Sequence, residues 1–336
     1  MSSVTTGPVV FLGSDDVAAR CLATLVERVD VTLVVTPPER RRGRRGTPEP
    51  APPGRVAAAL GIPVLATPDV NAPEALERLR LAAPRLLVVV AFGQLLRRAV
   101  RTAAPLGGIN LHFSLLPRWR GAAPVQRALL AGDTATGIAV QRVVRRLDAG
   151  PVLALEELAI HDDDDAPALL ERLTARGAPL LADVAERLLR GEDVPATEQD
   201  ETRVTVAPRI EKHEGALHLE QESGLALSRR VRAFGEWPGC RLALAAADGE
   251  LEVVRVRRAA PEQITARVEP GTVLAADPTG IVVAARDGAL RLLELQRSGG
   301  RPLPVRDFLL GRPVAVGSRV HAVDASSRGD DADSRS

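Results

Sequence analysis

Short apolar runs alternate with amphipathic segments along the first half of the chain. Strands are predicted at VVFLG (9–13), VDVTLVVT (29–36), IPVLAT (62–67), RLLVVVAF (85–92) and GGINLHF (107–113). Helices are predicted at DVAARCLATLVER (16–28), RVAAALG (55–61) and APEALERLRLAA (72–83). Strands that are apolar on both faces and alternate with helices are typical of a parallel sheet covered on both sides. The pattern predicts an α/β fold with a Rossmann-like, mostly parallel sheet and helices on both faces.

The second half changes character. Residues 166–192 read as helical with a break near Gly177 and Pro179, and residues 193–209 are polar and aperiodic, which predicts a linker. A helix at LALSRRVRAFG (225–235) is then followed by alternating runs that meet at Asp-Gly, a strong hairpin signal. These short strands predict a small β-barrel or β-sandwich, and we favour a β-barrel (OB-like). The expected organisation is therefore a first domain at 1–192, a linker at 193–209, a C-terminal β-barrel domain at 210–325 and a disordered tail at 326–336.

Composition limits the function classes. At 336 residues, with 45% hydrophobic and 26% charged residues, the chain is long enough for two globular domains. The net charge of +1 does not imply global steering toward nucleic acid, so any basic site must be local. Cys21 and Cys240 lie far apart without CxxC spacing, and the five histidines show no metal-ligand spacing, so we expect neither a disulfide framework nor a metal. No signal peptide or membrane-spanning run is evident, and a cytoplasmic protein without a membrane partner is expected.

Polar side chains end one of the apolar strands. Asn110 and His112 share a face of the strand, about 7 Å apart along the chain. Two such groups at a strand end suit an oxyanion that forms during attack on a carbonyl, and a carboxylate could fix the histidine. The best candidate is Asp148 in RRLDAGP, a turn after a strand-like run. Because ligands of such sheets bind beyond the carboxyl ends of the strands, the three residues are at the expected place.

Plainer explanations exist for these residues. An Asn-x-His at a strand end can cap or anchor a loop, and Asp148 can simply form a turn. A dinucleotide or P-loop site is rejected, because GSDDVA lacks the G-x-G-x-x-G spacing and no P-loop lysine is near. Without a nucleophile or metal, the simplest chemistry is one in which the substrate brings its own nucleophile and the protein positions it and stabilises the developing charge.

The segments NLHFSLLPRWRGAAPVQRALLAGDTATGI and LDAGPVL resemble the folate-dependent formyltransferases, and within them the branch that formylates methionyl-tRNA. The N-x-H, S-L-L-P and L-D-x-G elements are present and in order. GAAPVQRA favours the tRNA branch over relatives that act on nucleotide-linked sugars or purine precursors. TPPERRRGRRGTPEP, VVAFGQLL, QDETRVTVAPRIEKHEG, RAFGEWPG and LQRSGGRPLPVRDFLLG extend the resemblance over nearly the whole chain.

The resemblance implies transfer of the formyl group of 10-formyltetrahydrofolate to the α-amine of methionine on initiator methionyl-tRNA. It implies that Asn110 and His112 stabilise the oxyanion and that Asp148 orients His112 and helps to remove the amine's proton. The first domain would then bind formyl-folate and the barrel would bind tRNA, with no protein partner implied. The implied folate-binding residues are Phe92, Gly93, Gln94, Ser114, Leu115, Leu116 and Pro117.

One loop and one departure concern substrate recognition. Five arginines flank Gly43, and the resemblance implies that they reach the acceptor stem of the tRNA, although a solvated loop would look the same: Arg40, Arg41, Arg42, Arg44 and Arg45. Where the family has Gly-Thr-Pro-Glu-Phe after its first strand, this chain has Gly-Ser-Asp-Asp-Val at residues 13–17. That departure bears on how methionine is recognised.

Three other functions remain open from the sequence. The chain could formylate an amino sugar on a nucleotide, it could hydrolyse formyl-folate with water as the acceptor, or it could be an inert RNA- or folate-binding protein. The acceptor that takes the formyl group distinguishes the first two, and replacing His112 by alanine distinguishes the third.

Overall fold

The computed structural model describes residues 5–41, 47–245 and 250–323, and these cluster into two compact units. The first comprises residues up to Pro124, Ala135–Ala159 and Leu170–Ala207, and the second comprises Val125–Thr134, Ile160–Leu169 and the residues from Pro208 onward. Residues 193–207, from the segment predicted as a linker, thus cluster with the first unit. The limits of the two domains stay a prediction, and the tail at 326–336 lies outside the described residues.

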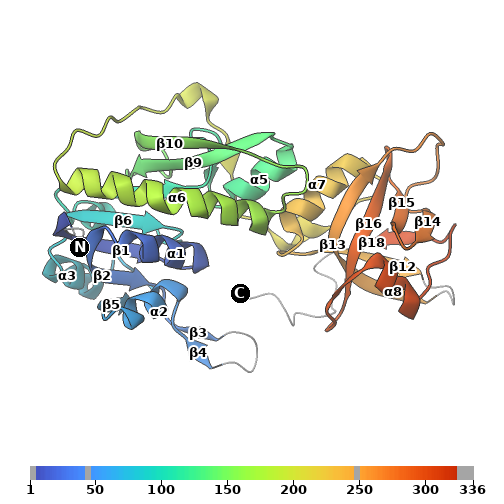
Figure 1. The fold of residues 1–336 in the computed structure, drawn as a ribbon, viewed down its shortest axis with the longest axis horizontal. Helices are drawn as coiled ribbons and strands as arrows, with labels where there is room; N and C mark the ends of the chain where they lie inside the picture. Colours follow the sequence, from blue (N-terminus) through green and yellow to red (C-terminus); the bar gives the residue numbers. More distant parts are fainter. Residues whose placement is uncertain (1–4, 42–46, 246–249, 324–336) are drawn as a thin grey trace. The chain divides into compact units, whose positions relative to one another are not determined.

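A seven-stranded sheet with the order β10-β9-β7-β6-β1-β2-β5 forms the centre of the first unit (Figure 1). The five strands from β7 to β5 run parallel, whereas β9 and β10 are antiparallel to their neighbours. The strands are β1 (Thr5–Gly13), β2 (Val29–Thr36), β5 (Val64–Ala66), β6 (Leu86–Val90), β7 (Gly108–His112), β9 (Ala135–Arg142) and β10 (Val152–Ala159). The predicted mostly parallel sheet is confirmed, and the predicted strand at 29–36 has the observed bounds.

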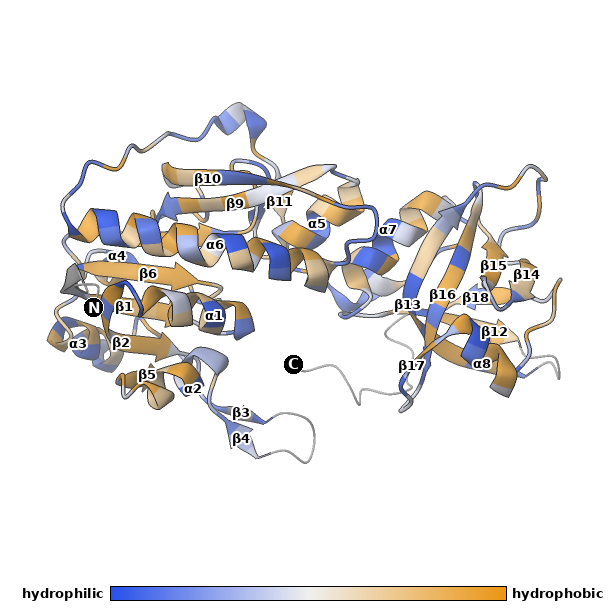
Figure 2. Ribbon diagram, in the orientation of Figure 1, coloured by the Kyte–Doolittle hydropathy of each residue, from blue (hydrophilic) through white to orange (hydrophobic). Residues whose placement is uncertain are grey.

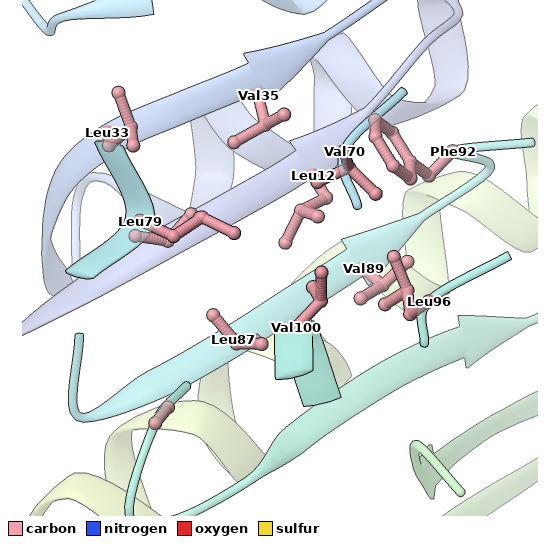
Figure 3. Close-up of a cluster of buried hydrophobic side chains, with 12 residues drawn as sticks. Leu12, Leu33, Val35, Val70, Leu79, Leu87, Val89, Phe92, Leu96 and Val100 are labelled. Carbon is pink, nitrogen blue, oxygen red and sulfur yellow. The ribbon is translucent and has the colours of Figure 1, made fainter. Parts of the chain in front are cut away.

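Helices cover both faces of this sheet. The helices of this unit are α1 (Asp16–Leu25), α2 (Pro52–Ala59), α3 (Pro73–Leu81), α4 (Arg98–Arg101) and most of α6 (Ala166–Leu189), whereas α5 (Pro124–Ala131) clusters almost wholly with the second unit. On one face, Leu79 of α3 and Val100 of α4 pack with alternate residues of β1, β2 and β6, such as Leu12 and Val89, in one buried cluster (Figure 3). On the other face, Gly177 of α6 lies against Leu111 and Ile138. β6 is hydrophobic along its whole length (Figure 2), as a strand buried on both faces must be.

The predicted break in the long helix is wrong, because α6 is continuous through Gly177 and Pro179. A Cβ on Gly177 would come within 3.1 Å of Leu111 Cδ2, so the glycine allows close packing of the helix on β7. Residue 179 lies well inside a 24-residue helix, where proline removes one backbone hydrogen bond. Packing on the sheet therefore outweighs the local helix-breaking tendency of the two residues.

Two pairs of short strands and a 3₁₀ turn also belong to the first unit. β3 (Arg40–Arg41) pairs with β4 (Pro48–Glu49) in an antiparallel hairpin, and β8 (Arg120–Gly121) pairs in parallel with β11 (Val206–Ala207). A 3₁₀ turn, η1 (Glu201–Arg203), precedes β11. The pairing of β8 with β11 attaches the chain after residue 193 to the loop that follows β7.

The second unit carries a curled antiparallel sheet with the order β14-β15-β16-β13-β12-β18, which confirms the predicted OB-like class. β17 adds to β16 outside this path. Its strands are β12 (Cys240–Ala245), β13 (Leu251–Glu262), β14 (Val273–Asp277), β15 (Gly280–Ala284), β16 (Ala289–Arg297), β17 (Pro302–Pro304) and β18 (Val320–Ala322). Its other elements are η2 (Lys212–Gly215), α7 (Gly224–Phe234) and α8 (Val305–Gly311). Both predicted hairpins form, β12 with β13 and β15 with β16.

Candidate functional site

β7 brings Asn110 and His112 to one face of the sheet at its carboxyl end. Asn110 lies opposite Val89 of the parallel neighbour β6 and opposite Gln141 of the antiparallel neighbour β9. Because opposite residues of paired strands project to the same face of a sheet, the side chains of Asn110 and Gln141 lie next to each other. His112 is buried and Asn110 is half-buried. The predicted pair therefore ends the strand on one face, at the sheet edge where such folds bind ligands.

The structure brings His112 and Asp148 together. Nδ1 of the imidazole lies 3.7 Å from Oδ2 of the carboxylate, and the two side chains are only 7% and 10% exposed. On the other side of the ring, Nε2 lies 2.9 Å from the backbone oxygen of Trp119. A carbonyl oxygen can only accept, so Nε2 carries a hydrogen and donates it. Nδ1 is therefore the ring nitrogen that faces the carboxylate.

Asp148 is fixed by donors on both of its oxygens. Oδ2 accepts a hydrogen bond of 3.0 Å from the backbone N–H of Gly121, and Oδ1 accepts one of 2.9 Å from Nε2 of Gln141. Its backbone has a φ of +50°, in the left-handed region that Asp tolerates better than most residues. The turn that the sequence predicted here thus aims the carboxylate at the imidazole.

The loop after β7 is held by residues from the segment predicted as a linker. The backbone N–H of Trp119 donates to Oγ1 of Thr205 at 2.8 Å. Gly121 has a φ of +128°, and a Cβ there would lie 2.4 Å from the backbone oxygen of Ala207, so no other residue fits without a shift. Thr205 therefore orients Trp119, whose carbonyl holds His112, and the close approach of β11 fixes the N–H that holds Asp148.

A buried arginine next to this loop connects it to the same segment. Arg120 is 7% exposed, and its Nε donates to Oε1 of Gln199 at 2.9 Å while Nη2 donates to Oε1 of Glu201 at 3.0 Å. Hydrogen bonds from Arg120 lower the pKa of the Glu201 carboxyl below its ordinary value, with a further contribution from the charge of Arg146. Gln199 in turn reaches the backbone oxygens of Asp148 and Gly150.

Sequence reasoning missed the residues that hold the site: Arg120, Gln141, Gln199 and Thr205. Periodicity could not reveal them, because Gln199 lies 51 positions from its partner Asp148. One signal was available for Gln141. It is a polar residue in a strand whose other inner positions are buried and small or aliphatic, and such a residue requires a hydrogen-bond partner.

The S-L-L-P segment forms a compact turn directly beyond His112. Ser114 is fully buried and its Oγ donates to the backbone oxygen of Arg118 at 2.6 Å. Leu116 is also buried and precedes a cis peptide bond to Pro117, whereas Leu115 and Pro117 are half-buried. Gly137 of β9 makes room for Leu115, since a Cβ there would lie 2.5 Å from Leu115 Cδ2. The hydroxyl of Ser114 is thus used to shape the turn.

The segment after β6 lies at the same edge of the sheet. The side chain of Phe92 is buried in the cluster of Figure 3, and its backbone oxygen accepts a hydrogen bond of 2.6 Å from Oγ of Ser14. The amide of Gln94 bridges the backbone of Thr67 and Val70. Gly93 is exposed with a φ of +77°, and a Cβ there would meet nothing within 4 Å. Of the three residues, Gly93 is the one that faces open space.

The turn after β1, where the chain departs from the family pattern, has a structural explanation. Asp15 caps α1 by accepting a hydrogen bond of 2.9 Å from the backbone N–H of Ala18. Although Asp15 as a whole is exposed, partial desolvation of its carboxyl at the start of α1 raises the pKa of that carboxyl above its ordinary value, and the neighbouring charge of Asp16 adds to this. Ser14 links β1 to β6, as described above. These residues are therefore used locally to begin the helix and join two strand ends.

The arginine loop begins and ends in the β3–β4 hairpin, where Arg40 pairs with Glu49 and Arg41 pairs with Pro48. The side chain of Arg41 is exposed. Arg42, Arg44 and Arg45 lie outside the described residues.

In residues 5–41, 47–245 and 250–323 there is no group of three His, Cys, Asp or Glu side chains that could hold a metal ion. Within those same ranges, no helix combines the length and hydrophobicity needed to span a bilayer.

The arrangement combines an amide, an imidazole and a fixed carboxylate at one strand end. Donors aimed at a common point stabilise an oxyanion, and a carboxylate next to them can accept a proton. Among the described residues, this set contains no serine or cysteine, and the hydroxyl of Ser114 in the adjoining turn donates to a backbone oxygen. The geometry thus suits attack on a carbonyl carbon by a nucleophile that the substrate supplies.

Comparison with known proteins gives a consistent result over both units. Residues 9–185 match the family model described as formyl transferase, and residues 209–313 match the model for the C-terminal domain of formyl transferases. The methionyl-tRNA formyltransferase of Burkholderia vietnamiensis is 39% identical over 327 residues, which cover 95% of this chain and 98% of that protein. The one from Xylella fastidiosa is 41% identical over 304 residues, 90% of this chain and 97% of the relative.

Among solved structures, HypX from Aquifex aeolicus in complex with tetrahydrofolic acid has a TM-score of 0.61 at 18% identity. The match covers 91% of this chain and 47% of HypX, so this chain spans about half the length of that protein. At this identity the likeness supports the fold alone.

Proposed function

Because this chain belongs to the formyl transferase family, we propose that it transfers the formyl group of 10-formyltetrahydrofolate to the α-amine of methionine on initiator methionyl-tRNA. The tRNA acceptor is supported by the near full-length relatives that carry the name methionyl-tRNA formyltransferase. The folate donor is supported by the family and by the tetrahydrofolate bound to HypX, which shares the fold. The observation that carries the proposal is the fixed carboxylate of Asp148 facing His112 at the end of β7.

In the proposed reaction the α-amine attacks the formyl carbon, and a C–N bond forms while the carbonyl π electrons move to oxygen. Asn110 donates an amide N–H to this oxyanion. Nε2 of His112 is engaged by Trp119, so Nδ1 is the ring atom that would hold a proton between the oxyanion and Asp148. Asp148 accepts the proton that the amine loses. When the intermediate collapses, the carbonyl re-forms and the bond from the formyl carbon to N10 of the folate breaks. N10 then takes up the proton that Asp148 received from the amine, which returns the carboxylate to its starting state.

We further propose that the segments after β6 and β7 bind the folate. The proposed residues are Phe92, Gly93, Gln94, Ser114, Leu115, Leu116 and Pro117. Their contacts suggest a division of roles. Ser114 and Gln94 hold loop backbone through hydrogen bonds, and the exposed backbone at Gly93 leaves space into which a ligand could fit.

For the tRNA we propose the arginine loop at residues 40–45: Arg40, Arg41, Arg42, Arg44 and Arg45. The exposed Arg41 of the β3–β4 hairpin begins this run of arginines, and guanidinium groups are suited to phosphate contacts, which depend on charge and on shape rather than on base sequence. The second unit, with the basic residues of the C-terminal part of the chain, would add to this binding.

A single assay tests the proposal. Purified protein is incubated with 10-formyltetrahydrofolate and, separately, with charged initiator tRNA, charged elongator tRNA, an amino-sugar nucleotide or no acceptor. We expect rapid formylation of initiator methionyl-tRNA and at most slow reaction elsewhere. Preferred formylation of the sugar nucleotide, or release of formate without an acceptor, would overturn the assignment of the acceptor.

A further inference from the structure

A hydrogen-bonded network of buried and half-buried side chains leads from Arg120 to the backbone and the carboxylate of Asp148. Nε of Arg120 donates to Oε1 of Gln199 at 2.9 Å. Nε2 of Gln199 donates to the backbone oxygens of Asp148 at 2.9 Å and Gly150 at 2.7 Å. Nε2 of Gln141 donates to Oδ1 of Asp148 at 2.9 Å. The backbone and the carboxylate of Asp148 are thus held by two different amides.

The orientation of both amides follows from the chemistry of their partners. A guanidinium has only donors, so Arg120 requires the oxygen of Gln199 and turns its NH₂ group toward Asp148. The NH₂ of Gln141 faces the carboxylate, which can only accept, and its Oε1 is turned toward Nε2 of Gln199, 3.3 Å away. The two hydrogens of Gln199 Nε2 are shared among three acceptors, and this contact is the longest of the three. Each amide is therefore fixed in one of its two possible flips, and Asp148 can only accept.

Burial of Gln141 and Arg120 strengthens the hydrogen bonds of this network. Gln141 is 2% exposed and Arg120 is 7% exposed, so water does not compete for their hydrogen bonds. Asp148 needs such support, because its backbone has a φ of +50° and a left-handed conformation is unfavourable for a residue with a Cβ. With Gln141 on Oδ1 and the N–H of Gly121 on Oδ2, each oxygen keeps a lone pair for the reacting groups.

We propose that Gln141 and Gln199 are positioning residues for Asp148, and that they act on the rate of the transfer step without touching either substrate. Gln141 sets the direction of the carboxylate, and Gln199 holds the turn at residues 148–150. The inference rests on the proposed function, because it requires Asp148 to take part in the reaction.

The primary test replaces Gln141 by methionine, which keeps the length of the side chain and removes its donors. We expect kcat to fall about tenfold, as for loss of a charge-assisted hydrogen bond, with KM for folate and for tRNA unchanged. The control is Gln296→Met, the same substitution at a glutamine of the second unit, where it removes an exposed hydrogen bond of 2.8 Å from the amide to the backbone oxygen of Gly300. The control should leave kcat unaltered.

A purely structural role predicts something different. It would lower the melting temperature of Gln141→Met and leave kcat per folded molecule at the wild-type value, and that result would overturn the proposal. Gln199→Glu is the second variant, and it decides the matter if Gln141→Met does not fold. It keeps the acceptor for Arg120 and removes the donors to Asp148 and Gly150, so kcat should again fall with KM unchanged, and an unchanged kcat would refute the inference.

The variant Asp148→Asn distinguishes a failure of the proposed function from a failure of the positioning role alone. If wild-type protein transfers no formyl group, the proposed function fails. If Asp148→Asn is fully active, the role of Asp148 in the reaction fails, and the positioning role fails with it. If Asp148→Asn is inactive but Gln141→Met and Gln199→Glu match the wild type, the positioning role alone fails.

Discussion

Nδ1 of His112 lies 3.7 Å from Oδ2 of Asp148, and each of the two side chains also makes a hydrogen bond to the backbone. The carbonyl of Trp119 holds the far nitrogen of the ring, and the N–H of Gly121 holds the carboxylate. The separation is longer than a hydrogen bond, so the two groups face each other across a narrow gap. An amine that approaches from beside the pair could donate to Oδ2 of Asp148 while Nδ1 of His112 donates to the oxyanion.

Thr205 should affect catalysis although it lies outside the proposed site. Thr205→Val removes the Oγ1 that accepts from the N–H of Trp119, whose carbonyl holds His112. Leaving the N–H of Trp119 without an acceptor costs about 1–3 kcal/mol. If Trp119 moves to find another acceptor, its carbonyl no longer holds the imidazole of His112 in place. We expect kcat for formyl transfer to fall about three- to tenfold by the same principle. Thr202→Val, at an exposed threonine bonded to Asp200, is the control, and equal kcat values for the two variants would contradict this role.

Gly93 tests the proposed folate pocket. Gly93→Ala places a methyl group in open space at a φ of +77°, and Gly61→Ala does the same at a φ of +70°. Both should lose similar stability, about 1–2 kcal/mol for a left-handed alanine. Only Gly93→Ala should raise KM for 10-formyltetrahydrofolate, about tenfold if the added methyl overlaps the ligand. Matching KM values in steady-state kinetics would remove Gly93 from the pocket.

The fold class and the placement of Asn110 and His112 could be predicted from local patterns, whereas the catalytic roles proposed for them and for Asp148 come from the family resemblance. The run of residues 29–36 reads as a strand by itself, and alternation along β7 places Asn110 and His112 on one face. The break expected in α6 was wrong because the packing of Gly177 on Leu111 is a tertiary contact. The contacts of Gln199 and Thr205 were invisible for the same reason. Their partners lie 51 and 86 positions away, and nothing in an aperiodic polar segment indicates them.

The arginine loop should determine the dependence of tRNA binding on salt. Replacing Arg40, Arg41, Arg42, Arg44 and Arg45 by alanine should raise KM for initiator methionyl-tRNA and leave KM for folate unchanged. Each lost phosphate contact should reduce the slope of log KM against log salt concentration by about 0.7–0.9. The double variant Arg78→Ala and Arg80→Ala, which removes exposed arginines of α3, is the control. An unaltered slope in the loop variant would exclude the loop from tRNA binding.

Asp15 should make stability depend on pH. Because partial desolvation raises the pKa of its carboxyl in the folded state, the native protein binds this proton more tightly than the unfolded chain. The associated stabilisation is complete below the ordinary pKa of 3.8 and is lost as the pH rises through the raised value. Asp15→Asn keeps a good helix cap and removes the titration.

Urea denaturation measures this effect. The free energy of unfolding of Asp15→Asn, relative to wild type, should increase from pH 4 to pH 7. Asp30→Asn, at an exposed position, serves as the control. A relative stability of Asp15→Asn that stays constant or decreases over this range would show that Asp15 does not titrate as described.

The central claim is that the carboxylate of Asp148 takes the proton of the attacking amine next to His112. The most direct measurement is kcat for formyl transfer to initiator methionyl-tRNA by Asp148→Asn, which keeps the shape and removes the charge. The account predicts a fall of about 10²- to 10⁴-fold, the usual contribution of general acid–base catalysis, with KM for both substrates and the melting temperature close to wild type. A kcat within about threefold of wild type, well below that contribution, would contradict it.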